Sequence, residues 1–239
     1  MKRSWRFFLT IIFLFPFVFL ANGTSRADTL EKSGIWFAGF GQGSFETIGP
    51  EFGKYLWWLD VQARYLGGGD HFKQGVVRPG LGYAITESTA VWLGYAWVGT
   101  SPIGGDDFQE QRIWQQLTWS TQLKPVMFSS RTRLEQRFLE TGDDTGWRFR
   151  QFFKLSYPLP FEARLKLVGY DEIFININKT DWGAETGLDQ NRVFLGFGWN
   201  LDAHERVITE VGYLNQYIRK PSGRDEMNHI LSINLFLNF

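Results

Sequence analysis

The sequence contains no cysteine and only three histidines among its 239 residues. Without cysteine, the chain can form no disulfide scaffold and cannot be anchored through a lipid-modified N-terminal cysteine. There are also no paired histidines and no glycine-rich phosphate loop between a strand and a helix, which are common signatures of metal and nucleotide sites. We therefore expect no metal and no cofactor.

A long apolar segment is also missing from most of the chain. After residue 27, no stretch approaches the about 20 apolar residues that a transmembrane helix requires. Before that point, three basic residues precede the apolar run Phe7–Leu20, and small and polar residues follow as far as Ala27. This order predicts a secretory signal peptide over residues 1–27, which leaves residues 28–239 as one mature domain.

The mature chain lacks an excess of positive charge. Of the 25 basic residues, four lie in the predicted signal peptide, which leaves 21 against 25 acidic residues and a net charge of about −4. Binding to nucleic acid through the overall charge of the protein is therefore not expected.

What the mature chain has is a repeated alternation of apolar and polar residues. Along the last nine residues, every second side chain is large and apolar, while Ser232, Asn234 and Asn238 lie between them. A strand shows this pattern when one face meets apolar surroundings and the other meets polar ones. Such an ending resembles the C-terminal signal that the outer-membrane assembly machinery recognises, so we expect that machinery as a partner. The residues of this predicted signal are Leu231, Ile233, Leu235, Leu237 and Phe239.

The connections between the predicted strands alternate in length. Tight turns such as Lys124-Pro125 and Asp202–His204 are separated by longer Gly- and Asp-rich segments such as Gly99–Phe108 and Lys179–Gly187. Short turns at one end and long loops at the other are typical of outer-membrane barrels, in which the short turns face the periplasm. We therefore predict an all-β fold, a transmembrane antiparallel up-and-down β-barrel in the cell outer membrane, surrounded by membrane lipid.

Two strand numbers fit this pattern. Ten strands account for residues 55–239, and ten is an even number, as in other single-chain bacterial barrels. The segment Gly34–Phe45 also has the pattern of a strand, and an eleventh strand would break the even number. Either this segment packs at the rim or in the lumen, or the region before Gly53 contributes two strands. Ten strands are therefore the prediction, and twelve are the alternative.

Many charged residues share one face of a predicted strand with charges of the opposite sign. In a barrel of about ten strands, such faces would line a narrow and packed lumen. The candidate lumen cluster consists of Arg112, Arg131, Arg133, Glu135, Arg137, Arg148, Arg150, Arg164, Lys166, Glu172 and Arg192. Further positions of inward parity are Asp60, Arg64, Arg78, Glu110, Lys154, Glu162 and Glu210.

Basic residues outnumber acidic ones in this cluster, which leaves two interpretations open. In the first, the charges are structural ion pairs, because a charge inside a narrow lumen needs a partner. In the second, the surplus arginines attract the carboxylate or phosphate groups of a small anionic solute. The preferred function is therefore non-enzymatic, either a structural barrel or a narrow channel that passes or binds small anionic solutes.

Two polar residues, Asp171 and His229, fall on positions that would face lipid. A charge there costs up to a few kcal/mol at mid-depth and little near the interface, so we expect Asp171 near a loop or at a bulge. His229 lies close to the predicted outer rim, and outer-membrane phospholipases use an outward histidine with a serine and an asparagine. A lipid-processing enzyme with His229 as its catalytic residue is the alternative function, although no spacing joins His229 to Asn191, Asn215 or Ser222.

Five short segments stand in a distinctive order along the mature chain. They are Glu110–Gln116, Arg131–Arg137, Tyr170–Phe174, Asp189–Arg192 and Gly212–Tyr217. Together they resemble an outer-membrane barrel family catalogued as domain of unknown function 2490, and the likeness extends from about Trp57 to Phe239. The resemblance implies a barrel in Gram-negative bacteria and supplies no activity.

Overall fold

A computed structural model describes residues 29–221 and 223–239, and this part of the chain is almost entirely β-structure. The predicted signal peptide, residues 1–27, lies outside the described residues and stays a prediction. Within them there is no α-helix, and no helical segment is long and apolar enough to cross a membrane. Three single-turn 3-10 helices are present, η1 (Phe45–Thr47), η2 (Pro50–Phe52) and η3 (Gly67–Gly69).

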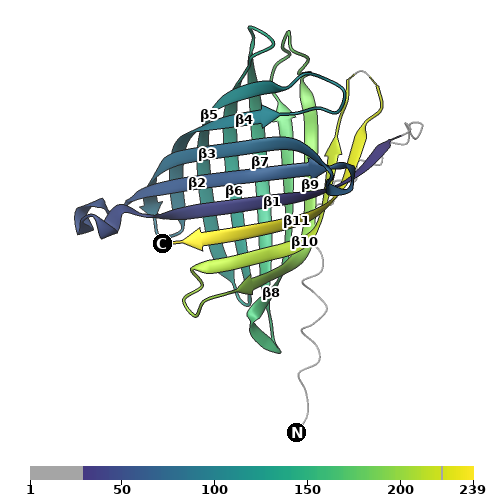
Figure 1. Ribbon diagram of the computed structural model, residues 1–239. Helices are drawn as coiled ribbons and strands as arrows, with labels where there is room; N and C mark the ends of the chain where they lie inside the picture. The colour runs from purple at the N-terminus through teal and green to yellow at the C-terminus, as the bar shows by residue number, and fades with distance from the viewer. Residues whose placement is uncertain (1–28, 222) are drawn as a thin grey trace.

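Eleven strands account for most of the described chain. They are β1 (Leu30–Ser44), β2 (Tyr55–Leu66), β3 (His71–Thr86), β4 (Thr89–Thr100), β5 (Phe108–Leu123), β6 (Val126–Leu139), β7 (Thr145–Leu159), β8 (Glu162–Asn176), β9 (Gly187–Asn200), β10 (Val207–Ile218) and β11 (Glu226–Asn238). Each strand pairs with the next in antiparallel fashion, and β1 pairs with β11, so the sheet closes into a barrel (Figure 1).

The barrel closes through a parallel pair of strands, which an odd strand number requires. β1 and β11 stay in register from Leu30 opposite Glu226 to Gln42 opposite Asn238. The predicted numbers of ten and twelve strands are therefore both wrong. The segment Gly34–Phe45 is neither a rim nor a lumen element, because nearly all of it belongs to the wall strand β1. Alternation in the sequence indicated a strand there, but it carries no information about which strand is the neighbour.

The connections differ at the two ends of the barrel. At the end that we call the short-turn end, the turns β3–β4, β5–β6 and β7–β8 each span two residues, whereas the β9–β10 connection spans six and the β1–β2 connection spans ten. At the opposite, long-loop end, the connections β4–β5, β6–β7, β8–β9 and β10–β11 span five to ten residues. Leu30 begins β1 at the long-loop end, whereas Phe239 follows β11 at the short-turn end (Figure 1).

The two faces of the wall have opposite character. In β9, the outward side chains of Leu195, Phe197 and Trp199 are 60%, 55% and 46% exposed, whereas the inward Phe194 is 1% exposed. The same alternation gives the other strands an apolar exterior. The described residues form two small apolar clusters inside, around Trp114 and around Phe194, and much of the remaining interior is polar or charged.

Candidate functional site

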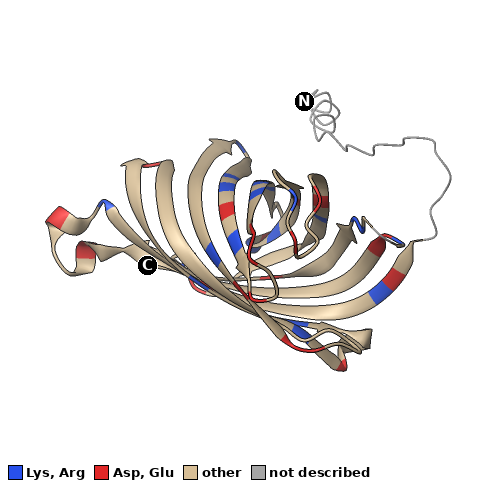
Figure 2. Cartoon of the chain, turned by 90° about the horizontal axis from the view of Figure 1, so that it is seen from above, with Lys and Arg blue, Asp and Glu red and all other residues tan. Residues whose placement is uncertain are grey.

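A layer of buried side chains fills the lumen about midway along the barrel. We call this layer the septum and define it by six side chains that are almost completely buried. They are Arg78, Trp114, Arg133, Glu135, Arg150 and Phe174. Figure 2 shows basic and acidic positions lying on neighbouring strands of the wall. The interior of the barrel is therefore a packed ionic layer and not a continuous open pore.

Glu135 of β6 is the central carboxylate of the septum. Its oxygens accept hydrogen bonds from Arg148 Nη2 at 2.7 Å and from Arg150 Nη1 at 2.5 Å. Arg133 and Arg112 place their Nη1 atoms 3.7 and 3.9 Å from the same carboxylate. One fully buried carboxylate therefore neutralises part of the charge of four arginines.

Two further carboxylates extend the ion-pair network. Glu110 accepts hydrogen bonds from Arg112 at 2.7 Å and from Arg137 at 2.5 Å. Glu172 lies 2.8 Å from Arg131, 2.6 Å from Arg150 and 3.9 Å from Arg192. The structure thus brings together most of the candidate lumen cluster. The members in this network are Arg112, Arg131, Arg133, Glu135, Arg137, Arg148, Arg150, Glu172 and Arg192.

Two members of the predicted cluster lie apart from this network. Arg164 is exposed at the start of β8, where the register between β7 and β8 shifts after Pro158. Arg164 therefore lies outside the lumen, although its position along the strand has inward parity. Glu162 is exposed at the same hairpin. Lys166 lies at the short-turn end and pairs with Glu205 at 2.7 Å.

Arg64 of β2 lies in the lumen without a carboxylate partner among the described residues. Its guanidinium donates hydrogen bonds to the side-chain oxygens of Gln62 and Gln74. It also stacks on the ring of Trp36, 4.4 Å from the ring centroid. The sequence placed Arg64 and Gln62 on the same inward face, but Gln74 and Trp36 could not be assigned to Arg64, because they come from the neighbouring strands β3 and β1.

The septum separates two cavities. The long-loop chamber has a volume of about 700 Å³, and its lining includes eleven basic side chains against four acidic ones. Arg64, Arg137 and Arg192 are among the basic groups, and Glu110 is among the acidic ones. The chamber therefore carries a surplus of positive charge, although the chain as a whole has a formal net charge of zero.

Two outer loops meet at the mouth of the long-loop chamber. Trp182 of the β8–β9 loop donates a hydrogen bond from Nε1 to the carbonyl oxygen of Asp144, and its ring lies 5.0 Å from the guanidinium of Arg137. The backbone N–H groups of Asp143 and Asp144 donate to the Asp181 carboxylate and hold its pKa below the ordinary value. The β8–β9 loop is thus tied to the β6–β7 loop and forms part of the chamber wall.

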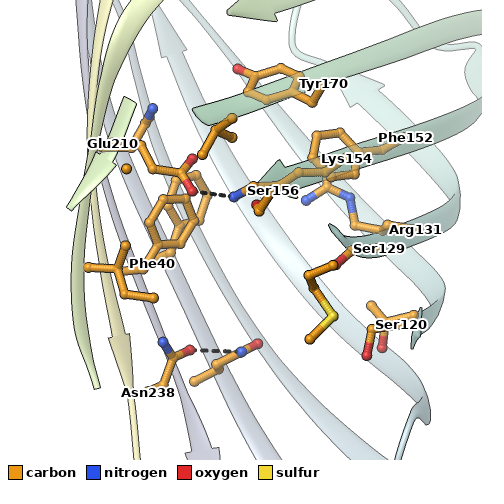
Figure 3. A pocket seen from close by; sticks show the side chains of 18 of the residues that line it. Phe40, Ser120, Ser129, Arg131, Phe152, Lys154, Ser156, Tyr170, Glu210 and Asn238 are labelled. Atoms are coloured by element: carbon orange, nitrogen blue, oxygen red, sulfur yellow. Dashed lines mark hydrogen bonds and ion pairs between the residues drawn. The ribbon is translucent and has the colours of Figure 1, made fainter. Parts of the chain in front are cut away.

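The second cavity, the short-turn chamber, has a volume of about 750 Å³ and a mixed lining. Figure 3 shows the ion pair between Lys154 and Glu210, which spans 2.5 Å, with Arg131 and Phe152 on the neighbouring wall. The cations named here each have a carboxylate partner, since Arg131 pairs with Glu172. This chamber is therefore closer to charge balance than the long-loop chamber.

His229 lies on the outer surface of β11, within a small polar cluster. The hydroxyl of Tyr213 is 2.6 Å from His229 Nδ1, and the amide of Asn215 donates to the same hydroxyl at 3.3 Å. Glu31 of β1 approaches His229 Nε2 at 3.9 Å. Of the three partners considered from the sequence, Asn215 lies close to His229. Asn191 lies on β9, and β10 separates it from the strand of His229. Ser222 lies outside the described residues.

The residues of the predicted C-terminal assembly signal lie on the outward face of β11 and at the position directly after this strand. Leu231, Leu235 and Phe239 are exposed on the exterior, with Ile233 and Leu237 between them. Among the described residues, no group of three or more histidine, aspartate or glutamate side chains could hold a metal ion.

Comparisons with known proteins give a family and no activity. The family described as "Protein of unknown function (DUF2490)" matches residues 33–228. An uncharacterized protein of Methylorubrum extorquens is 30% identical over 233 residues, which cover 96% of this chain and 98% of the relative. No solved structure matches the chain. The chain therefore belongs to the DUF2490 family.

Proposed function

We propose that the protein is an outer-membrane β-barrel whose long-loop chamber binds small anionic solutes. Exposed apolar side chains all around the barrel support the membrane placement, because soluble monomers rarely expose apolar patches of more than a few hundred Å². Leu81 of β3 and Leu195 of β9, on different sides of the wall, are 65% and 60% exposed. Three two-residue turns at one end of the barrel, and no two-residue turn at the other end among the described residues, support this placement.

In the part of the chain that the structure describes, no carboxylate pairs with Arg64, and this observation indicates that the solute is an anion. A buried guanidinium without an anionic partner is costly, and a bound carboxylate or phosphate would supply that partner with bidentate geometry. Arg192 adds to the same surplus, since the single carboxylate that the described residues place within ion-pair distance of it, Glu172, is 3.9 Å away. Because the septum divides the lumen into separate cavities, the proposal concerns binding and does not require an open pore.

Replacing Arg64 by glutamine is expected to weaken the binding of inorganic phosphate about tenfold or more. A hydrogen bond to a charged group contributes about 1.5–3 kcal/mol, and about 1.4 kcal/mol corresponds to a factor of ten. Isothermal titration of the folded barrel in lipid nanodiscs, at constant ionic strength, measures this change. Arg206→Gln is the matched control, because Arg206 is an exposed cation of the β9–β10 turn at the other end. Undiminished phosphate binding by Arg64→Gln would contradict the proposal.

A second candidate function, lipid processing at the outer rim, is supported by the line of Glu31, His229 and Tyr213. A hydroxyl bonded to an imidazole that in turn faces a carboxylate is the arrangement of an activated nucleophile. For this function we expect ester hydrolysis in phospholipid vesicles to fall at least about a thousandfold in His229→Ala and in Tyr213→Phe. Tyr217→Phe, on the same face of β10, is the control. Equal hydrolysis by all four proteins, wild type included, would exclude the candidate.

A further inference from the structure

Cations of the long-loop chamber form two groups at different depths. The first, which we call the inner pair, consists of Arg64 and Arg192, close to the septum. The second, which we call the outer group, consists of Lys32, Lys73 and Lys220, toward the mouth of the chamber. All five side chains line the same cavity, so one occupant can contact both groups.

The inner pair shares the ring of Trp36. The guanidinium groups of Arg64 and Arg192 lie 4.4 and 5.1 Å from the centroid of this ring. Arg64 donates to two glutamine side chains, and Arg192 donates to Gln190 at 3.2 Å. Among the described residues, Arg192 Nε has no hydrogen-bond partner, and Glu172 is 3.9 Å from this guanidinium. The inner pair therefore lacks one close anionic group, which a guanidinium binds in bidentate geometry.

The three ammonium groups of the outer group share one carboxylate. Lys32 Nζ lies 3.1 Å from Glu226, and Lys220 Nζ lies 3.6 Å from the same side chain. Lys73 is within electrostatic range of all three, but among the described residues no carboxylate lies within ion-pair distance of it. Three positive charges against one negative charge leave the mouth with a net charge of about +2.

A β-bulge directs Lys73 into the chamber. The register between β2 and β3 shifts between Arg64 and Tyr65, which leaves Lys73 without a paired residue on β2. Because of this extra residue, Lys73 and Gln74 both line the chamber, although they are adjacent along β3. Asp171, which we expected near a loop or at a bulge, instead pairs regularly with both neighbouring strands. Bulges often redirect a side chain toward a functional site, and this one gives the chamber an ammonium group in addition to the amide of Gln74.

The two groups of cations lie at separate levels of the wall. Trp36 of β1 pairs with Arg64, which sets the level of the inner pair. Lys32 lies four residues closer to the long-loop end on the same strand. At a rise of about 3.3 Å per residue, these two levels are about 13 Å apart along the strand. An extended ligand is therefore needed to occupy both levels.

We propose that the long-loop chamber binds elongated dianions, molecules that carry one carboxylate or phosphate group at each end. The inner pair binds one end through bidentate hydrogen bonds, and the ammonium groups of the outer group bind the other end as point charges. Joining two anionic groups in one molecule makes the second contact intramolecular, and the gain is largest when the molecule matches the span. The inference rests on the proposed function and adds the number and the spacing of the charges.

Isothermal titration of the mature barrel in lipid nanodiscs, at constant ionic strength, tests the number of anionic groups. Suberate, a linear dicarboxylate, is expected to bind at least about tenfold more tightly than its monoamide, which has the same length and one charge fewer. Succinate, a shorter dicarboxylate, is expected to have no such advantage over its own monoamide. Hexanediol bisphosphate against hexanediol monophosphate is the second arm, which shows whether carboxylate or phosphate is the preferred end group.

Lys73→Gln is expected to weaken suberate binding about tenfold and to leave the binding of inorganic phosphate unchanged. Because the inner pair binds phosphate, unchanged phosphate binding also shows that the variant barrel is folded. Lys220→Gln, in the β10–β11 loop, is a second variant that alters no strand. Lys54→Gln is the matched control, because Lys54 is an exposed cation at the short-turn end.

Equal affinity for each dianion and its singly charged analogue would overturn the inference. Suberate binding that is unchanged in both Lys73→Gln and Lys220→Gln would also overturn it. If phosphate binds and depends on Arg64 while the dianions have no advantage, only this inference is wrong. If neither phosphate nor any of the dianions binds, the proposed function is wrong as well.

Discussion

Glu135→Gln is expected to lower the free energy of unfolding by about 3–5 kcal/mol, the usual cost of removing one partner from a buried ion pair. Glu135 is fully buried and is the common partner of Arg148 and Arg150, with Arg112 and Arg133 within 4 Å. The amide has almost the same shape as the carboxylate, so the loss arises from charge and not from a cavity. Denaturant titration of the barrel folded in phospholipid vesicles, followed by tryptophan fluorescence, measures it.

Glu205→Gln is the matched control for this change. Glu205 also forms an ion pair, with Lys166 at 2.7 Å, but the side chain of Glu205 is 57% exposed. Exposed pairs contribute about 0–1 kcal/mol, so the control is expected to stay within that range of wild type. If both variants lowered the free energy of unfolding by the same small amount, a neutral group could replace Glu135. The ion pairs of Glu135 would then not stabilise the septum.

Gly80→Ala is expected to destabilise the barrel by about 3 kcal/mol, at the upper end of the usual cost of overpacking. A Cβ atom added to Gly80 would lie 2.7 Å from Cζ2 of Trp114, a side chain with no exposed surface. The indole has little room to shift because Gly94 underlies it as well, with the carbonyl oxygen of Pro79 beside it. The same denaturant titration in vesicles records the loss.

Two comparisons separate this packing effect from a general effect of alanine. Gly39→Ala, on the outer face of β1, is expected to be nearly neutral, because an added Cβ there meets no atom within 4 Å. In a Trp114→Leu background, Gly80→Ala is expected to cost much less, since the clash is with the indole. Additive losses in the double variant would show that Trp114 is not the cause.

The sequence predicts the wall of the barrel well, because each strand carries its own evidence. Alternation of period two is a local property, and it identified all eleven segments that form strands, including Gly34–Phe45. The strand number was nevertheless wrong, because closure depends on a pairing between β1 and β11 that no local pattern encodes. The even number typical of bacterial barrels then favoured ten or twelve.

The candidate site was predictable as a set of residues and not as a set of partners. Parity placed Glu135 and the arginines of β6 and β7 on one face, and the structure brings them together. Arg164 was assigned to the lumen by the same parity, but a register shift at Pro158 leaves it outside. Parity placed Gln62 beside Arg64, but it could not indicate that Gln74 of β3 also accepts a hydrogen bond from the Arg64 guanidinium, since that depends on the register between two strands.

The parallel seam between β1 and β11 has a consequence for the order of assembly. It joins residues that are 196 positions apart, as the hydrogen bond from Gln42 to Asn238 illustrates. Contacts between distant parts of a chain form slowly, because loop-closure entropy is lost before the contact is gained. Until the final strand arrives, the growing sheet has two unpaired edges that can aggregate with other chains. Shielding of both edges until β1 and β11 pair is therefore expected to increase the yield of folded protein.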